Sequence, residues 1–190
     1  MGSGKVVLLL SFFVFSCVAG LTASSYAADN VINNPGFEEQ GSWTVWGKEE
    51  WKRDVSSPEE KHEGIKSYKV VIGNAEAWDS TIAEQIIYGV PAEGSFEGSV
   101  WVKVPAKTPL VNTLVYLEVW LIREDGSEYK KFQSVQLDNQ AVPDWQKLTV
   151  SGTIPPEAKT IKYWLVIAPQ KEDCAGTVYF DDAVLKIISP

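Results

Sequence analysis

The sequence predicts an all-β protein, and two observations about its pattern carry that prediction. Beyond residue 29, no segment repeats its apolar residues with the 3.6-residue period of an amphipathic helix. Instead, apolar and polar residues alternate with a period of two in a series of short segments bounded by Gly, Pro, Asn and Asp. Strands at this spacing leave no room for crossover helices, so we expect an antiparallel sandwich or barrel.

The expected strands follow one another along most of the chain. The clearest alternation runs from Ser95 to Val104, where Phe96 and Val100 lie on one side and Glu97 and Trp101 on the other. Polar turns separate the segments, and we find no internal repeat and no second domain. The predicted strands are Ser67–Gly73, Thr81–Tyr88, Ser95–Val104, Asn112–Arg123, Tyr129–Leu137, Gln146–Gly152, Thr160–Ala168 and Thr177–Ile187.

Residues 1–28 have the pattern of a secretory signal peptide. Lys5 precedes an apolar run from Val6 to Leu21, and Ser25 and Ala27 fit a signal-peptidase site. The run is about 16 residues long, shorter than the ~20 that a bilayer span needs, which argues against a membrane anchor. Lipid attachment at Cys17 is an alternative, although the preceding residues form a poor lipobox. We therefore expect a secreted protein, without membrane insertion, whose single domain comprises residues 29–190.

Charge and composition exclude several functions. The net charge is −8, from 17 basic against 25 acidic residues, and no basic block occurs, so nucleic acid is not an expected partner. One histidine and two cysteines in 190 residues disfavour a histidine-based catalytic centre or a cysteine-rich zinc site. Only Cys174 follows the signal sequence, so the domain has no internal disulfide and must be stabilised by its core.

Several short motifs occur in order after the signal sequence. The first is Asn30–Glu38 and the last is Gly176–Leu185; His62–Val70, Gly94–Lys103 and Trp145–Leu148 lie between them. Together they resemble carbohydrate-binding modules of the family 4/9/16/22 type. The resemblance implies a jelly-roll β-sandwich of two antiparallel sheets that binds a polysaccharide or oligosaccharide and carries a structural calcium ion. Such modules are usually joined to a glycoside hydrolase, so a separate glycoside hydrolase or a surface complex is the expected further partner.

The resemblance also implies a set of calcium ligands. These are the backbone carbonyls of Gly36 and Lys66 and the carboxylates of Glu38 and Asp181. Ca²⁺ prefers several such oxygen ligands, and adjacent first and last strands would bring them together. Asp182 remains an alternative to Asp181, because a shift of one residue reverses the face of a strand. The alternative is that no ion binds there and that Asp181 and Asp182 are an ordinary solvated pair. The expected role of the ion is stability, since it binds only the folded state.

Aromatic and hydrogen-bonding residues gather on the non-core faces of the predicted strands. Val115, Leu117, Val119 and Leu121 are the core set of one strand, which leaves Tyr116, Glu118 and Trp120 opposite. Indole and phenol rings stack on the C–H faces of sugars, while Glu and Gln bind sugar hydroxyls. We expect Phe132, Ser134 and Gln136 to share this type of face. We expect Trp43 and Trp145 to be packing residues. Packing is also the alternative to ligand contact for every other Trp. The candidate carbohydrate-binding residues are Trp46, Trp101, Tyr116, Glu118, Trp120, Gln136 and Trp164.

No catalytic constellation is evident in the sequence. A glycosidase needs two carboxylates flanking the scissile bond, and no second acid is clearly placed to partner Glu118. His62 lies in a charged segment and is expected at the surface. The sequence therefore predicts a secreted, non-catalytic module that binds β-linked polysaccharides of the β-glucan, cellulose or mannan class. A cell-surface adhesion domain that binds protein is the alternative.

Overall fold

The computed structural model describes residues 29–47, 51–74 and 80–189, and the signal-peptide prediction lies outside these ranges. Strands dominate the described residues, which contain no helix and therefore none suited to crossing a bilayer. The strands are β1 (Thr44–Trp46), β2 (Lys52–Ser57), β3 (Ser67–Ile72), β4 (Thr81–Tyr88), β5 (Gly94–Val104), β6 (Thr113–Arg123), β7 (Glu128–Gln133), β8 (Leu137–Asp138), β9 (Val142–Ile154), β10 (Ala158–Pro169) and β11 (Gly176–Ile188).

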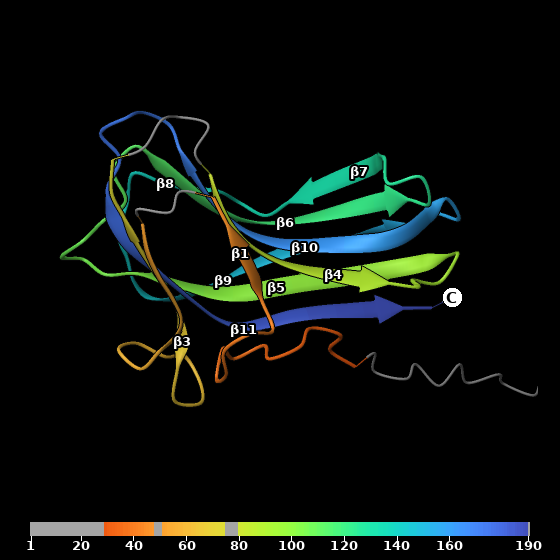
Figure 1. Ribbon diagram of the computed structural model, residues 1–190, viewed down its shortest axis with the longest axis horizontal. Coiled ribbons are helices and arrows are strands. Elements are labelled where there is room, and N and C mark those ends of the chain that lie inside the picture. Colours follow the sequence, from red (N-terminus) through yellow and green to blue (C-terminus); the bar gives the residue numbers. More distant parts are fainter. Residues whose placement is uncertain (1–28, 48–50, 75–79, 190) are drawn as a thin grey trace, which may run out of the picture.

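Two antiparallel sheets pack face to face as a β-sandwich, as the sequence predicts (Figure 1). The six-stranded sheet has the order β1-β4-β10-β6-β7, with β8 also pairing with β6. The five-stranded sheet has the order β2-β3-β11-β5-β9. The segment before β1 runs beside the last strand, where the Val31 amide donates to the Leu185 carbonyl over 2.9 Å. The two ends of the domain therefore meet, and residues distant in the sequence are brought together there.

The main core fills the space between the sheets. Alternation along β6 buries Val115, Leu117, Val119 and Leu121 completely, and alternation along β10 buries its own apolar set in the same way. A buried hydrogen bond also ties the sheets together, because the Tyr163 hydroxyl of β10 donates to the Ser99 carbonyl of β5 over 2.6 Å. The core prediction is thus confirmed for both strands, and it fixes which residues face outward.

The strand expected over Tyr129–Leu137 is interrupted. β7 ends at Gln133, and the Ser134 hydroxyl accepts a hydrogen bond from the Leu117 amide over 3.0 Å. Pairing with β6 resumes only at Leu137, so the alternation does not continue through the break. Phe132, before the break, pairs with the core residue Val119 of β6 and packs inward, edge-on to Phe96 with ring centroids 5.2 Å apart. The expectation that Phe132, Ser134 and Gln136 share an outer face is wrong. β1 and β2 lie before the first strand that the sequence predicts.

Candidate functional site

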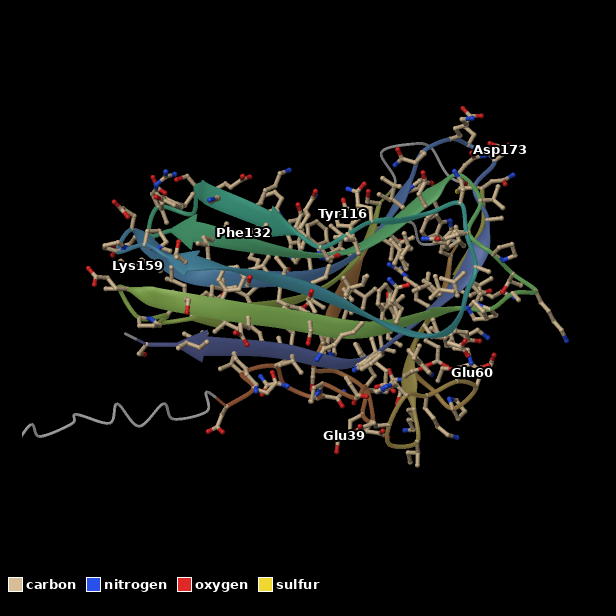
Figure 2. The ribbon with its side chains drawn as sticks, turned by 180° about the vertical axis from the view of Figure 1, so that it is seen from behind. Glu39, Glu60, Tyr116, Phe132, Lys159 and Asp173 are labelled. Carbon is tan, nitrogen blue, oxygen red and sulfur yellow. The ribbon has the colours of Figure 1, made fainter. Side chains whose placement is uncertain are left out.

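The outer face of the six-stranded sheet collects aromatic and acidic side chains from five strands. The register places Trp164 of β10 between Glu84 of β4 and Glu118 of β6, and Glu118 lies opposite Gln133 of β7. Trp46 of β1 lies next to β4 at one edge. Figure 2 shows Tyr116 on this side of the molecule, with Glu39 and Glu60 on the opposite side. We call this surface the aromatic face; it comprises Trp46, Ile82, Glu84, Tyr116, Glu118, Trp120, Lys131, Gln133, Lys162, Trp164 and Val166.

Three indole rings form the centre of the aromatic face. Trp120 and Trp164 are tilted against each other, with ring centroids 4.5 Å apart. Trp46 meets Trp164 edge-on at 6.0 Å. Trp164 is 8% exposed and belongs to a small apolar cluster outside the main core, against which Tyr116 and Trp120 pack. Trp46 is 47% exposed. The buried ring thus supports its neighbours, and the outer rings present an apolar surface to solvent.

Two buried carboxylates hold the polar part of the aromatic face in place. The Trp164 indole N–H donates to Glu84 Oε1 over 2.7 Å, and the Gln133 amide donates to Glu118 Oε1 over 2.8 Å. Each acid also has a lysine partner. Lys162 Nζ lies 3.8 Å from Glu84, and Lys131 Nζ lies 3.9 Å from Glu118. The acids are therefore compensated, and their remaining acceptor capacity is fixed in direction.

The same two lysines lie over the rings. Lys162 Nζ is 5.6 Å from the centroid of Trp164, and Lys131 Nζ is 5.5 Å from that of Trp120. Each lysine therefore has both a carboxylate and an aromatic ring as neighbours. Glu84, Lys131, Gln133 and Lys162 were not predicted as site residues. The outward alternation of β10 exposes Lys162 in the sequence, but the other three follow only from strand register.

Trp101 does not lie on the aromatic face. It belongs to β5 of the five-stranded sheet, between Asp181 of β11 and Lys147 of β9. Its ring is stacked on His62, with centroids 4.1 Å apart and an interplanar angle of 18°. The expectation that Trp101 shares a surface with Trp120 is wrong, because alternation predicts an outward side chain without specifying its sheet. Gln136 is exposed between β7 and β8. Gln133, rather than Gln136, lies beside Glu118 on the aromatic face.

The tryptophans assigned to packing have structural surroundings. Trp43 is 7% exposed, stacks on Phe37 at 4.8 Å and donates its indole N–H to the Asn34 carbonyl. Trp145 is half-buried and meets the His62 ring edge-on at 5.7 Å. Trp51, which the sequence did not assign, is buried in the main core and donates to the Gly73 carbonyl. These three rings contribute to the scaffold rather than to the aromatic face.

The residues expected to bind calcium converge at the junction of the N-terminal segment and β11. A Cβ atom added to Gly36 would lie 3.7 Å from both Asp181 Oδ1 and Glu38 Oε1, so the two carboxylates approach the same stretch of backbone. Lys66 is adjacent, because its backbone amide donates to Glu38 Oε1 over 3.4 Å. Asp182 is turned away and lies 2.6 Å from His62 Nδ1. Of the two aspartates, Asp181 is therefore the one that faces Glu38.

The surroundings of Asp181 fit a cation. The side chain is completely buried, and burial raises the pKa of this carboxyl to about 6, although the His62 amide donates to it over 2.7 Å. A buried carboxylate beside a second one is unfavourable without a compensating positive charge. Carboxylate and backbone oxygens are also the donors that Ca²⁺ prefers. The donor set thus fits a calcium ion.

Comparison with known proteins identifies the family to which this β-sandwich belongs. The family model described as "Carbohydrate binding domain" matches residues 29–171. The chain therefore belongs to this family of carbohydrate-binding domains. No curated protein matches the chain.

Solved structures share the fold at low sequence identity. The TmCBM61 domain in complex with β-1,4-galactotriose is 20% identical, with a TM-score of 0.59 over 84% of this chain and 99% of that one. The CBM22-1 xylan-binding domain from Paenibacillus barcinonensis Xyn10C is 17% identical, with a TM-score of 0.58 over 86% and 97%. The CBM22-1–GH10 modules of Clostridium thermocellum xylanase 10B, complexed with xylohexaose, are 18% identical with a TM-score of 0.55. That match covers 86% of this chain and 29% of the xylanase chain.

Proposed function

We propose that the protein is a secreted, non-catalytic module that binds β-linked polysaccharide chains of the β-glucan, cellulose or mannan class on the aromatic face. The observation that carries this proposal is the cluster of Trp46, Trp120 and Trp164 on an outward sheet face, braced by Glu84 and Glu118. Large rings on a solvated surface leave apolar area in water, which a bound sugar would cover.

The chemistry of the face suits a glycan chain. The rings of Trp46 and Trp120 would stack on the apolar faces of pyranose units. Glu118, Gln133 and the lysines would bind equatorial hydroxyls, and they are already held in position by one another. Such preorganisation lowers the entropy cost of binding. The row of residues runs across the strands from β4 to β7, so a chain would lie across the sheet.

A catalytic role fits this arrangement less well. Glycoside hydrolysis requires one carboxylic acid to deliver a proton and a second carboxylate opposite it. Glu84 and Glu118 each accept a hydrogen bond and face a lysine, which suits fixed hydrogen-bond acceptors. We therefore propose that the protein acts beside a glycoside hydrolase or within a surface complex, without cleaving the glycan itself.

A structural calcium ion completes the proposal. Glu38, Asp181 and the backbone oxygens of Gly36 and Lys66 would hold it where the N-terminal segment meets β11. The ion would fasten the start of the domain to its last strand. It lies in a different part of the fold from Trp120, so we expect it to stabilise the scaffold without contacting the glycan.

Affinity gel electrophoresis tests the function directly. The purified protein is run through gels that contain soluble β-glucans, mannans or xylans, once with calcium and once with chelator. Retardation by a β-glucan or mannan supports the proposal. Retardation only by xylan would keep the binding role and replace the sugar class. A folded protein that no polysaccharide retards would contradict the proposal and favour the adhesion domain.

A further inference from the structure

Two adjoining cavities lie along the five-stranded sheet, and the larger one extends to Phe132 and Gln133 at the β7 edge of the other sheet. The larger has a volume of about 610 Å³ and the smaller of about 240 Å³. Lys147 and Val184 line both cavities, so the two form one elongated depression. The larger volume lies within the ~300–1,000 Å³ that is typical of ligand sites. We call this depression the polar groove.

Strand register explains the lining of the polar groove. Ser99 of β5 lies between Val184 of β11 and Thr149 of β9. In the next row, Glu97 lies between Lys186 and Ser151. Because alternate residues of a strand face the same way, these hydroxyl and charged groups point outward together. The groove therefore offers closely spaced donors and acceptors over three strands.

One end of the groove is formed by the smaller cavity, which Trp101, Glu63 and Asp182 line. The stacked His62 covers one face of the Trp101 ring and limits its role as a stacking platform. Lys147 Nζ lies 5.9 Å from the ring centroid. A ligand at this end would accordingly meet the indole edge, an ammonium group and carboxylates, rather than a free aromatic face.

Charges along the groove nearly balance. Lys147 and Lys186 offset Glu97 and Glu63, and Asp182 is engaged by His62. A site of this kind has no strong preference for an anion or a cation. Its spaced hydroxyl, amine and carboxylate groups instead match the hydroxyls of an uncharged sugar chain.

We propose that the polar groove is a second glycan-binding site, which takes a short neutral oligosaccharide mainly through hydrogen bonds. The inference rests on the proposed glycan-binding function of the protein, but on a different surface. Gln133 lines the larger cavity and also donates to Glu118 on the aromatic face, so the two surfaces meet at the β7 edge. One long chain that contacts both surfaces would bind more tightly than a short one, through effective concentration.

NMR titration of the purified protein separates the two sites. Cellohexaose, xylohexaose and mannohexaose are each added to ¹⁵N-labelled protein, and backbone amide shifts are followed on β6 and β10 and on β5 and β9. We expect two groups of shifting amides, one on β6 and β10 and one on β5 and β9, whose titration curves give different dissociation constants. Glu97→Ala and Lys147→Ala should each weaken binding at the groove about tenfold, the equivalent of one hydrogen bond to a charged group. Glu97→Gln, which keeps the side-chain length and one acceptor oxygen, should restore part of that affinity.

Matched variants exclude indirect effects. Trp120→Ala should weaken only the group on β6 and β10. Thr153→Ala should change neither group, because Thr153 faces outward farther along β9 and pairs with Ser95. The inference is overturned if only the aromatic-face amides shift at saturation. It is also overturned if Glu97→Ala and Lys147→Ala bind at the groove as tightly as the parent protein. If neither group shifts with any of the three hexaoses, the proposed function fails together with this inference.

Discussion

The two outer faces of the sandwich are built by the same alternation, yet they differ in what they present to solvent. On the six-stranded sheet, Trp46, Trp120 and Trp164 cluster with acids that are buried and paired. On the five-stranded sheet, β5 and β9 present hydroxyls and exposed charges, and the Trp101 ring is covered by His62. An outward Trp is therefore not by itself evidence of a binding site, because the side chains next to it on the sheet determine whether its ring can contact a ligand.

The largest expected effect on stability comes from the proposed calcium ion, which lies away from the aromatic face. At a calcium concentration about 1,000 times its dissociation constant, the ion would add ~4 kcal/mol to the free energy of unfolding. For a domain of this size, chelation should lower the melting temperature by roughly 10 °C, as measured by scanning calorimetry. Glycan affinity of the aromatic face, measured well below the melting temperature, should stay constant because this face lies elsewhere.

Variants at the junction sharpen that prediction. Glu38→Gln and Asp181→Asn should melt at the same temperature with and without calcium. Asp182→Asn should keep the calcium response, because Asp182 faces His62 rather than Glu38. Equal responses from the two aspartate variants would contradict the assignment of Asp181 as the ligand.

Substitution of Trp120 tests the aromatic face directly. Trp120→Ala should lower glycan affinity by about 30-fold, or ~2 kcal/mol, in isothermal titration calorimetry, because it removes a central stacking ring. Its melting temperature should change less than that of Trp51→Ala, since Trp51 is buried in the main core and truncation there costs ~3–5 kcal/mol. If Trp120→Ala unfolds the protein as readily as Trp51→Ala, Trp120 is a packing residue and the binding role moves to Trp46.

The break after β7 leads to a smaller, residue-specific effect. Gln133→Ala should reduce glycan affinity about fivefold, because it removes the amide that is bound to Glu118. Gln136→Ala should leave the affinity unchanged, since Gln136 is exposed between β7 and β8. Calorimetric titration of both variants with the same polysaccharide decides the matter. A larger loss in Gln136→Ala than in Gln133→Ala would instead support the continuous strand that the sequence predicts over Tyr129–Leu137.

The smallest effect concerns an exposed ion pair on the five-stranded sheet. The hydrogen bond from Lys69, followed by that from Tyr179, lowers the pKa of Glu59. A lowered folded-state pKa adds stability above the unfolded pKa, and that contribution is lost as the pH falls through the folded value. Denaturant titrations should therefore find Glu59→Gln slightly less stable than the parent at pH 7 and equal to it at strongly acidic pH. The difference should be small, because the side chain is largely exposed.

The features that the sequence predicts correctly are those with a local physical signal. Alternation in β6 and β10 predicts the core sets correctly, because every second residue of each strand faces the space between the sheets. It failed at β7, where Ser134 interrupts the pairing, and at β1, whose three residues are too few to show a period. The pairing of β7 with β6 places Gln133 beside Glu118, and the break after Gln133 leaves Gln136 exposed between β7 and β8.

The all-β class, the core faces of β6 and β10 and the family resemblance follow from the sequence, because period and motif order can be read along the chain. Which outward residues become neighbours depends on how the strands are arranged in the folded protein. Strand order placed Trp101 on one sheet and Trp120 on the other, and register joined Glu84 to Trp164 and Asp181 to the N-terminal segment. These contacts link residues far apart in the chain, and pairing between distant strands leaves no periodic trace in either of them.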